Sequence, residues 1–127
     1  MELSLSTRAV GDRAVIETAG QIDVYTAAQF RQEITDAIDA GKRHLIIDLN
    51  QIVFLDSTGL GVLVGGLKRV RTLGGSLSVV CSDLDVLRPF HITGLDKVFV
   101  IHDTVDQAVD AVSGGPAGSD RASRDNT

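Results

Sequence analysis

An α/β domain with a mainly parallel central sheet and about four helices is the fold class that this sequence predicts. A hairpin pattern opens the chain, strand-like and helix-like segments alternate after it, and one strand-like segment is apolar almost throughout. Such alternation implies right-handed crossovers between parallel strands, with the hairpin as an antiparallel edge. The chain has 127 residues, which suits one domain, expected over residues 1–112.

The opening segments predict the hairpin and the first helix. Residues 3–7 alternate apolar and polar side chains, and residues 14–19 form a second strand-like segment after a Gly-Asp turn signal. A helix is expected over residues 25–39, where apolar side chains recur at helical spacing. Gly41 follows its last turn, in the position where glycine commonly ends helices.

The middle of the chain predicts a buried strand and a glycine-rich helix. Residues 44–49, HLIIDL, are typical of a central strand covered on both faces. We expect a short loop over residues 50–55 and a second helix over residues 56–73. Gly74 and Gly75 should end that helix.

The remaining segments predict two more strands and two more helices. Strands are expected at residues 76–81 and 98–101. Residues 83–92 predict a third helix. Pro89 should kink it or lie near its start, because proline inside a helix costs about 3 kcal/mol.

The C-terminal segment predicts a last helix and then a tail. Thr104 and Gln107 have the spacing of a capping box, for a helix that begins after Asp103 or Thr104 and ends near residue 112. Residues 113–127 show no apolar periodicity and should form a disordered tail.

The composition argues against several classes of protein. The net charge of −5 argues against direct nucleic-acid binding, which needs a basic surface. The single cysteine, Cys81, has no partner for an internal disulfide and fits a reducing compartment. Residues 1–7 lack a signal-peptide pattern, and the apolar runs are too short to span a bilayer. We therefore expect a cytoplasmic protein with no membrane span.

The segment most informative about function is residues 55–66, LDSTGLGVLVGG. They place Ser57 at a predicted helix start, where free N–H groups and the helix dipole favour anions. A phosphate there would add about −1.5 to −2 charges beside Asp56. Glycines such as Gly59 and Gly61 would let a partner's backbone come close. The alternative is structural: Asp56 or Ser57 as the helix cap, and glycines for tight packing of the helix on the sheet.

Enzymatic chemistry finds little support. Asp23, Asp48 and Asp56 could act as acids, bases or metal ligands, but caps and strand-end contacts are the favoured interpretation. The three histidines are scattered without metal-ligand spacing. The sequence around Ser57 also differs from the G-x-S-x-G elbow of serine hydrolases. No cofactor, no metal and no catalytic residue are expected.

Four motifs resemble the STAS domain family of bacterial anti-sigma factor antagonists. Residues 56–63, DSTGLGVL, are similar to its signature, and residues 20–27, GQIDVYTA, to its G-x-[IL]-D-x-x-[ST]-A segment. Residues 45–49 resemble its central strand and residues 92–95 its T-G-L turn. The resemblance covers about residues 3–112.

The resemblance implies a phosphorylation switch. The unphosphorylated protein would bind an anti-sigma factor and free a sigma factor, and that anti-sigma factor would be a serine kinase that uses ATP to phosphorylate Ser57. A metal-dependent serine phosphatase would reverse the step, and a weak homodimer is left open. The partner-binding residues implied by the motifs are Asp23, Thr26, Asp56, Ser57, Thr58, Gly59 and Gly61. Thr58 is also a candidate for minor phosphorylation.

Two other functions compete with this one. A STAS subunit of a membrane transport complex would use the same surface without a phosphate cycle. An aspartate-phosphorylated receiver domain would need an acidic pair after its first strand, which residues 3–13 do not supply.

Overall fold

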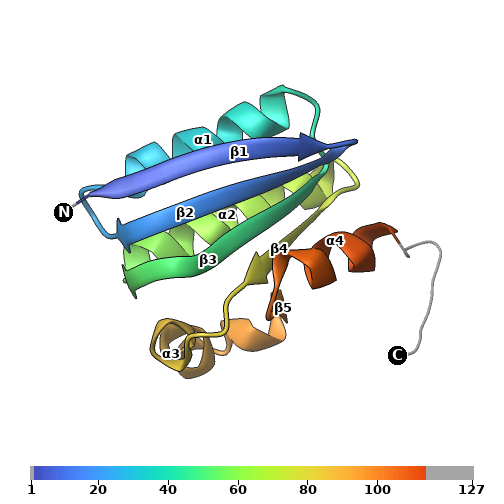
Figure 1. Ribbon diagram of the computed structural model, residues 1–127. Helices are drawn as coiled ribbons and strands as arrows, with labels where there is room; N and C mark the ends of the chain where they lie inside the picture. Colours follow the sequence, from blue (N-terminus) through green and yellow to red (C-terminus); the bar gives the residue numbers. More distant parts are fainter. Residues whose placement is uncertain (1, 114–127) are drawn as a thin grey trace.

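The structure, a computed structural model, describes residues 2–113, which form a five-stranded sheet with helices on both faces (Figure 1). In sheet order the strands are β1 (Leu3–Val10), β2 (Arg13–Ile22), β3 (His44–Leu55), β4 (Ser76–Val80) and β5 (Val100–His102). The helices are α1 (Ala27–Asp39), α2 (Ser57–Thr72), α3 (Leu84–Thr93) and α4 (Val105–Ser113), and a 3-10 helix η1 spans Leu95–Lys97. Strands β1 and β2 are antiparallel and the other pairs are parallel, so the predicted fold class is confirmed.

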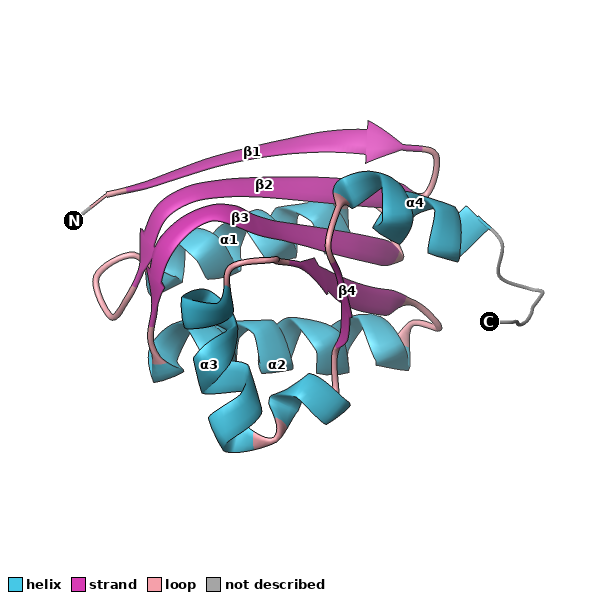
Figure 2. Ribbon diagram, turned by 60° about the horizontal axis from the view of Figure 1, so that its bottom comes forward, coloured by secondary structure: helices cyan, strands magenta, loops and turns pink. Residues whose placement is uncertain are grey.

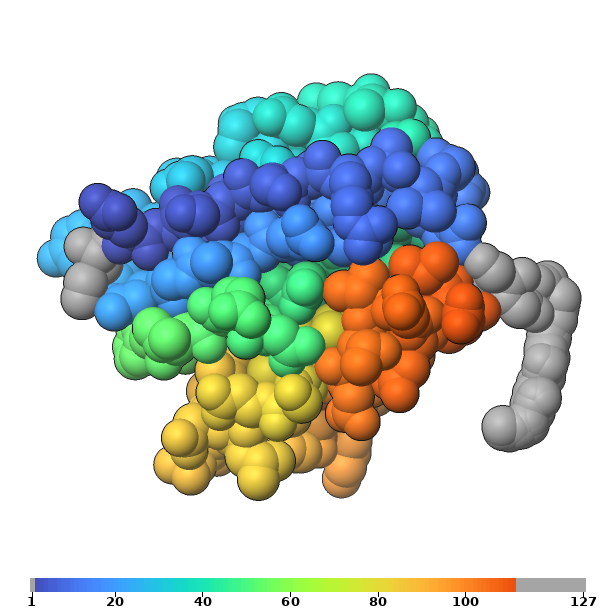
Figure 3. All heavy atoms as spheres, in the orientation of Figure 1, coloured from blue at the N-terminus to red at the C-terminus, as the bar shows by residue number. Residues whose placement is uncertain are grey.

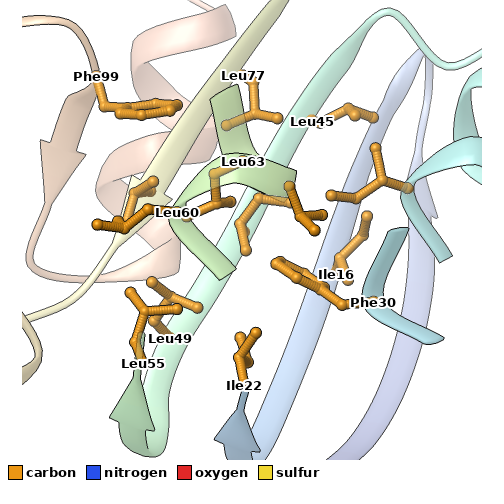
Figure 4. Close-up of a cluster of buried hydrophobic side chains, with 14 of the residues drawn as sticks. Ile16, Ile22, Phe30, Leu45, Leu49, Leu55, Leu60, Leu63, Leu77 and Phe99 are labelled. Atoms are coloured by element: carbon orange, nitrogen blue, oxygen red, sulfur yellow. The ribbon is translucent and has the colours of Figure 1, made fainter. Parts of the chain in front are cut away.

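The two faces of the sheet are covered unequally. Helices α1 and α2 lie on one face and α4 lies on the other (Figure 2). The larger core lies between the sheet and α1, α2 and α3, where Phe30, Leu63 and Phe90 are fully buried. Figure 4 shows Phe30 and Leu63 within this cluster. A smaller cluster under α4 contains Ile46 and Ala108. In Figure 3, α4 occupies one part of this second face while β1 and β2 are in view beside it. Both faces of β3 are therefore buried near its start, as its apolar sequence predicted.

Glycines end α1 and α2 as expected. Gly41 has a φ of +93°, and Lys42 donates its backbone N–H to the Ala37 carbonyl at 3.1 Å. Gly74 has a φ of +79°, and the Gly75 N–H donates to the Val70 carbonyl at 2.7 Å. Both ends are Schellman motifs, which satisfy carbonyls that the helix leaves free.

The expected loop at residues 50–55 is wrong, because β3 continues to Leu55. Its second half pairs with β2 as far as Ile22 opposite Leu55, through irregularities in register between Glu17 and Ala19 and between Gly20 and Gln21. Polar side chains at positions 50 and 51 suggested a loop, but backbone pairing with β2 sets the length of the strand.

Helix α3 begins at Leu84 and runs through Pro89, so the interpretation that it starts near the proline is wrong. The Asp83 side chain caps it by accepting a hydrogen bond from the Asp85 N–H at 2.9 Å. Burial of α3 against the core offsets the one backbone hydrogen bond that proline removes. The kink at Pro89 stays a prediction.

Helix α4 begins with the expected capping residues. The Gln107 N–H donates to the Thr104 hydroxyl at 3.2 Å, while the Gln107 side chain accepts from the Asp103 N–H at 3.0 Å. The helix reaches Ser113, one residue into the expected tail. The rest of the predicted disordered tail, residues 114–127, lies outside the described residues.

Candidate functional site

Two turns at the carboxyl ends of β2 and β3 lie side by side. Ile22 and Leu55, the last residues of these parallel strands, are partners in the sheet register. Figure 1 shows β2 and β3 as neighbours in the sheet. The Asp56 N–H donates to the Ile22 carbonyl at 3.2 Å and ties the second turn to the first. The motif around Asp23 and the motif around Ser57 therefore form one surface, although 33 positions separate Asp23 from Asp56 in the sequence.

The Asp56 turn leaves Ser57 on the surface. The Asp56 carboxylate accepts hydrogen bonds from the Thr58 N–H at 2.9 Å and the Gly59 N–H at 3.2 Å, so Asp56 is the N-cap of α2. Ser57 is the first helical residue and is exposed. The capping interpretation is correct for Asp56. It leaves the Ser57 hydroxyl outside the cap, where another protein can reach it.

The Asp23 turn is closed. The Asp23 carboxylate accepts from the Tyr25 N–H at 2.9 Å and the Thr26 N–H at 3.1 Å. The Thr26 hydroxyl donates to the Gln21 carbonyl at 2.9 Å and accepts from the Asp23 N–H at 3.0 Å. Asp23 and Thr26 are 8% and 4% exposed. These two predicted partner-binding residues thus shape the loop from inside.

The residues that this loop exposes to solvent are Val24, 65% exposed, and Tyr25, 84% exposed. Sequence analysis did not single them out. A signal was present at Val24, a large apolar side chain that precedes the expected helix and belongs to no helix or strand period. Tyr25 was placed in the expected helix, but α1 begins only at Ala27. Val24 and Tyr25 therefore form the exposed apolar surface of this loop.

The glycines of α2 have two different environments. Gly59 is buried, and a Cβ there would lie 2.5 Å from the Leu55 side chain and 2.7 Å from the Ile22 side chain. The expectation that Gly59 admits a partner is corrected: its missing side chain lets α2 pack on the strand ends. A Cβ on Gly61 would meet no heavy atom within 4 Å, so Gly61 stays a predicted partner contact.

A groove of about 420 Å³ opens beside Ser57. It lies between the end of β3, the first turn of α2 and one face of α3, and Val53, Phe54, Pro89 and Ile92 contribute to its lining. Three of these apolar side chains, those of Val53, Phe54 and Ile92, are exposed to solvent. The serine therefore lies at the rim of an apolar surface of the kind that protein partners cover.

The charged side chains that line this groove are Asp56, Asp85 and Arg88. Elsewhere, Cys81 is buried, and this burial is the main cause that raises the pKa of its thiol. Burial is also the main cause that lowers the pKa of His102. The Asp48 carboxylate accepts from the Asn50 N–H at 3.0 Å. This contact lies within β3 and not at its end as expected, because the strand continues to Leu55.

Residues 2–113 contain neither a cluster of metal-ligating side chains nor a helix that could span a membrane. No three histidine, cysteine, aspartate or glutamate side chains come together there as a metal site would require. None of the helices in that range has the length and apolar character needed to cross a membrane.

This order of elements, with an exposed serine at the first turn of α2, is the arrangement of a small α/β regulatory domain. The family model described as the STAS domain matches residues 4–108, and the chain belongs to this family. The predicted resemblance is therefore confirmed.

The relatives share one kind of name. The chain is 40% identical over 86 residues to an anti-sigma-B factor antagonist of Bacillus subtilis (strain 168), covering 68% of this chain and 78% of the relative. It is 35% identical over 104 residues to the anti-sigma-F factor antagonist RsfB of Mycobacterium tuberculosis (strain H37Rv), covering 80% and 83%.

Solved structures agree with this. An anti-sigma factor antagonist from Mycobacterium paratuberculosis superposes with a TM-score of 0.82 at 30% identity, covering 88% of this chain and 95% of that one. The anti-sigma factor antagonist SpoIIAA in its unphosphorylated form gives a TM-score of 0.77 at 25% identity, covering 87% and 97%. SpoIIAA in its phosphorylated form, from Bacillus, shares the fold at 22% identity and a TM-score of 0.68.

Proposed function

We propose that this chain is an anti-sigma factor antagonist whose binding to an anti-sigma factor is switched off by phosphorylation of Ser57. The relatives carry this name, and one of them is known in phosphorylated and unphosphorylated forms. The observation that carries the proposal is the exposed Ser57 hydroxyl, outside the cap of α2 and at the rim of an apolar groove.

In the unphosphorylated state, the anti-sigma factor covers the apolar side chains around Ser57. Val24 and Tyr25 from the first turn and Val53, Phe54 and Ile92 around the groove are exposed in the free protein. Burying them contributes roughly 25 cal/mol for each Å² of apolar surface removed from water. Ser57 is small and uncharged, so it fits within such an interface at little cost.

Phosphorylation reverses this balance. The anti-sigma factor acts as a serine kinase and transfers the γ-phosphoryl group of ATP to the Ser57 hydroxyl oxygen. The bond between the γ-phosphorus and the β–γ bridging oxygen breaks, ADP leaves, and the hydroxyl proton passes to a base of the kinase or to water. The product carries about −1.5 to −2 charges next to Asp56 and at the rim of an apolar groove. Burying this group under a partner is expensive unless it is paired. The fold tolerates it, since the N-terminus of a helix favours negative charge.

The rest of the cycle uses other proteins. A metal-dependent serine phosphatase removes the phosphate, and this chain itself catalyses no reaction, needs no cofactor and works in the cytoplasm. Thr58 is a poorer acceptor than Ser57 because it is only half-exposed, one position further into α2.

Titration calorimetry with the purified anti-sigma factor kinase tests the proposal. We expect Ser57→Ala to bind within about threefold of the wild type and to take up no phosphate from ATP. Ser57→Glu should weaken binding at least about tenfold, which corresponds to 1.4 kcal/mol. Thr58→Ala is the matched control and should still be phosphorylated at Ser57.

Two results would count against the proposal. If Ser57→Ala and Ser57→Glu bind the kinase with equal affinity, negative charge at position 57 does not switch binding. Recovery of a membrane transport ATPase from the host, in place of a kinase, would support the alternative function as a transport subunit.

A further inference from the structure

Arg88 is the one cation among the residues that line the groove beside Ser57. It projects from α3, on the same helix face as Pro89 and Ile92, whereas Ser57 lies on the opposite wall at the start of α2. Its guanidinium Nη2 is 3.3 Å from the Asp85 carboxylate, one turn earlier in α3. The groove thus holds a serine, an arginine and two carboxylates, those of Asp56 and Asp85.

The ion pair between Arg88 and Asp85 is weak. The two side chains are 68% and 85% exposed, and a pair in this setting contributes between about 0 and 1 kcal/mol. Arg88 can therefore leave Asp85 for a better partner at little cost. Within residues 2–113, Asp85 is the one residue that forms a hydrogen bond or ion pair with this guanidinium.

We propose that Arg88 binds the phosphate on Ser57 across this groove and so closes the groove in the phosphorylated protein. This inference rests on the proposed phosphorylation of Ser57. A phosphate near its second ionisation carries up to about two negative charges, against one on the Asp85 carboxylate. The planar guanidinium also matches two phosphate oxygens at once. Both differences favour exchange of Asp85 for the phosphate.

The consequence is a second way to block the partner. The new charge alone makes the rim of the surface costly to bury. An arginine held across the groove in addition covers apolar lining, including Phe54 and Pro89, that a partner would occupy. The Asp56 and Asp85 carboxylates repel the phosphate and favour its pointing to solvent. The phosphate therefore stays in the groove only when the Arg88 guanidinium is positioned to bind it.

Phosphorus NMR on the full chain, carrying phosphoserine at position 57 by genetic incorporation, tests the pairing. A cation bound to the phosphate lowers its second pKa, which is near 6 in the free group. We expect Arg88→Gln to raise this pKa by about half a pH unit relative to the unsubstituted phosphoprotein, as befits an exposed pair. The same pKa in both proteins would overturn the proposal.

Arg71→Gln is the matched control. Arg71 is exposed on α2, 14 residues beyond Ser57, which is about 21 Å along the helix. It removes the same charge without reaching the phosphate, so its pKa change should stay below about 0.1 unit at moderate salt, where the screening length is roughly 8–10 Å. An equal shift in both variants would also overturn the proposal, since it would reflect net charge alone.

Closure of the groove has its own readout. With the anti-sigma factor as titrant, Arg88→Gln should raise the affinity of the phosphorylated chain by about threefold. Arg71→Gln should leave the affinity of the phosphorylated chain unchanged. Unchanged affinity would overturn closure. The NMR titration needs neither kinase nor partner, so it can succeed even where the proposed function fails.

Discussion

The two turns that form the site share one backbone design and differ in where they place a hydroxyl. Each follows a buried aliphatic residue at the end of a parallel strand, Ile22 or Leu55. Each begins with an aspartate, Asp23 or Asp56, whose side chain accepts from the N–H groups two and three residues later. A helix follows both.

The side chains around these aspartates give the turns opposite characters. One position after the aspartate, Val24 and Ser57 are both exposed; three positions after it, Thr26 and Gly59 are both buried. The first turn keeps its hydroxyl inside, on Thr26, and shows an apolar side chain. The second keeps a glycine inside and shows its hydroxyl, on Ser57. The same turn therefore exposes an apolar side chain in one place and a hydroxyl in the other, which in the proposed function are a fixed contact and a modifiable one.

The largest expected effect comes from giving the second turn the buried residue of the first. Gly59→Thr should destabilise the protein by about 3 kcal/mol, because its Cβ would overlap the Leu55 and Ile22 side chains. Urea unfolding measures this. Gly61→Thr, at an open position of the same helix, should change stability by less than about 0.5 kcal/mol. Equal costs for the two variants would mean that the packing at Gly59 is unimportant.

Removing the inward hydroxyl of the first turn should cost less. Thr26→Val leaves the Asp23 N–H and the Gln21 carbonyl without their hydroxyl partner, which predicts a loss of about 2 kcal/mol in the free energy of unfolding. Thr58→Val, at the half-exposed position of the second turn, should stay within about 0.5 kcal/mol in the same urea series. A larger loss for Thr58→Val would invert the comparison.

The aspartate cap of the second turn should have a smaller effect again. Asp56→Ala removes the acceptor of two N–H groups at the start of α2 and should cost about 1 kcal/mol. Asp56→Asn keeps an acceptor oxygen and should cost only a few tenths of that amount. Thermal unfolding of the two variants checks this, and a full loss in Asp56→Asn would show that charge dominates the cap.

The smallest effect on stability is expected at the modifiable position itself. Ser57→Asp should change the free energy of unfolding by less than about 0.5 kcal/mol, because attraction to the helix N-terminus offsets repulsion from Asp56. Val24→Asp, at the same place in the first turn, is the control. If Ser57→Asp lowers the free energy of unfolding by more than about 1 kcal/mol, reduced partner binding by this variant would reflect unfolding and not a switched surface.

Local signals predicted the fold well. Glycines marked the ends of α1 and α2, the apolar segment marked β3, and the motif resemblance placed Ser57 at a helix start. The errors came where distant segments decide the outcome. Residues 50–55 contain polar side chains but become strand because β2 pairs with them. Gly59 was assigned to a partner surface, because spacing along one helix does not show which side meets Ile22 and Leu55.

The sequence by itself determined the order of elements, the ends of two helices and the identity of the serine, because capping, turn chemistry and periodicity act over a few residues. Only the tertiary structure decided that the Asp23 and Asp56 turns touch, that Val24 and Tyr25 face outward, and that Arg88 shares a groove with Ser57. These relations join segments separated by about 30 positions in the chain, and packing between them, which no local pattern records, sets their distances.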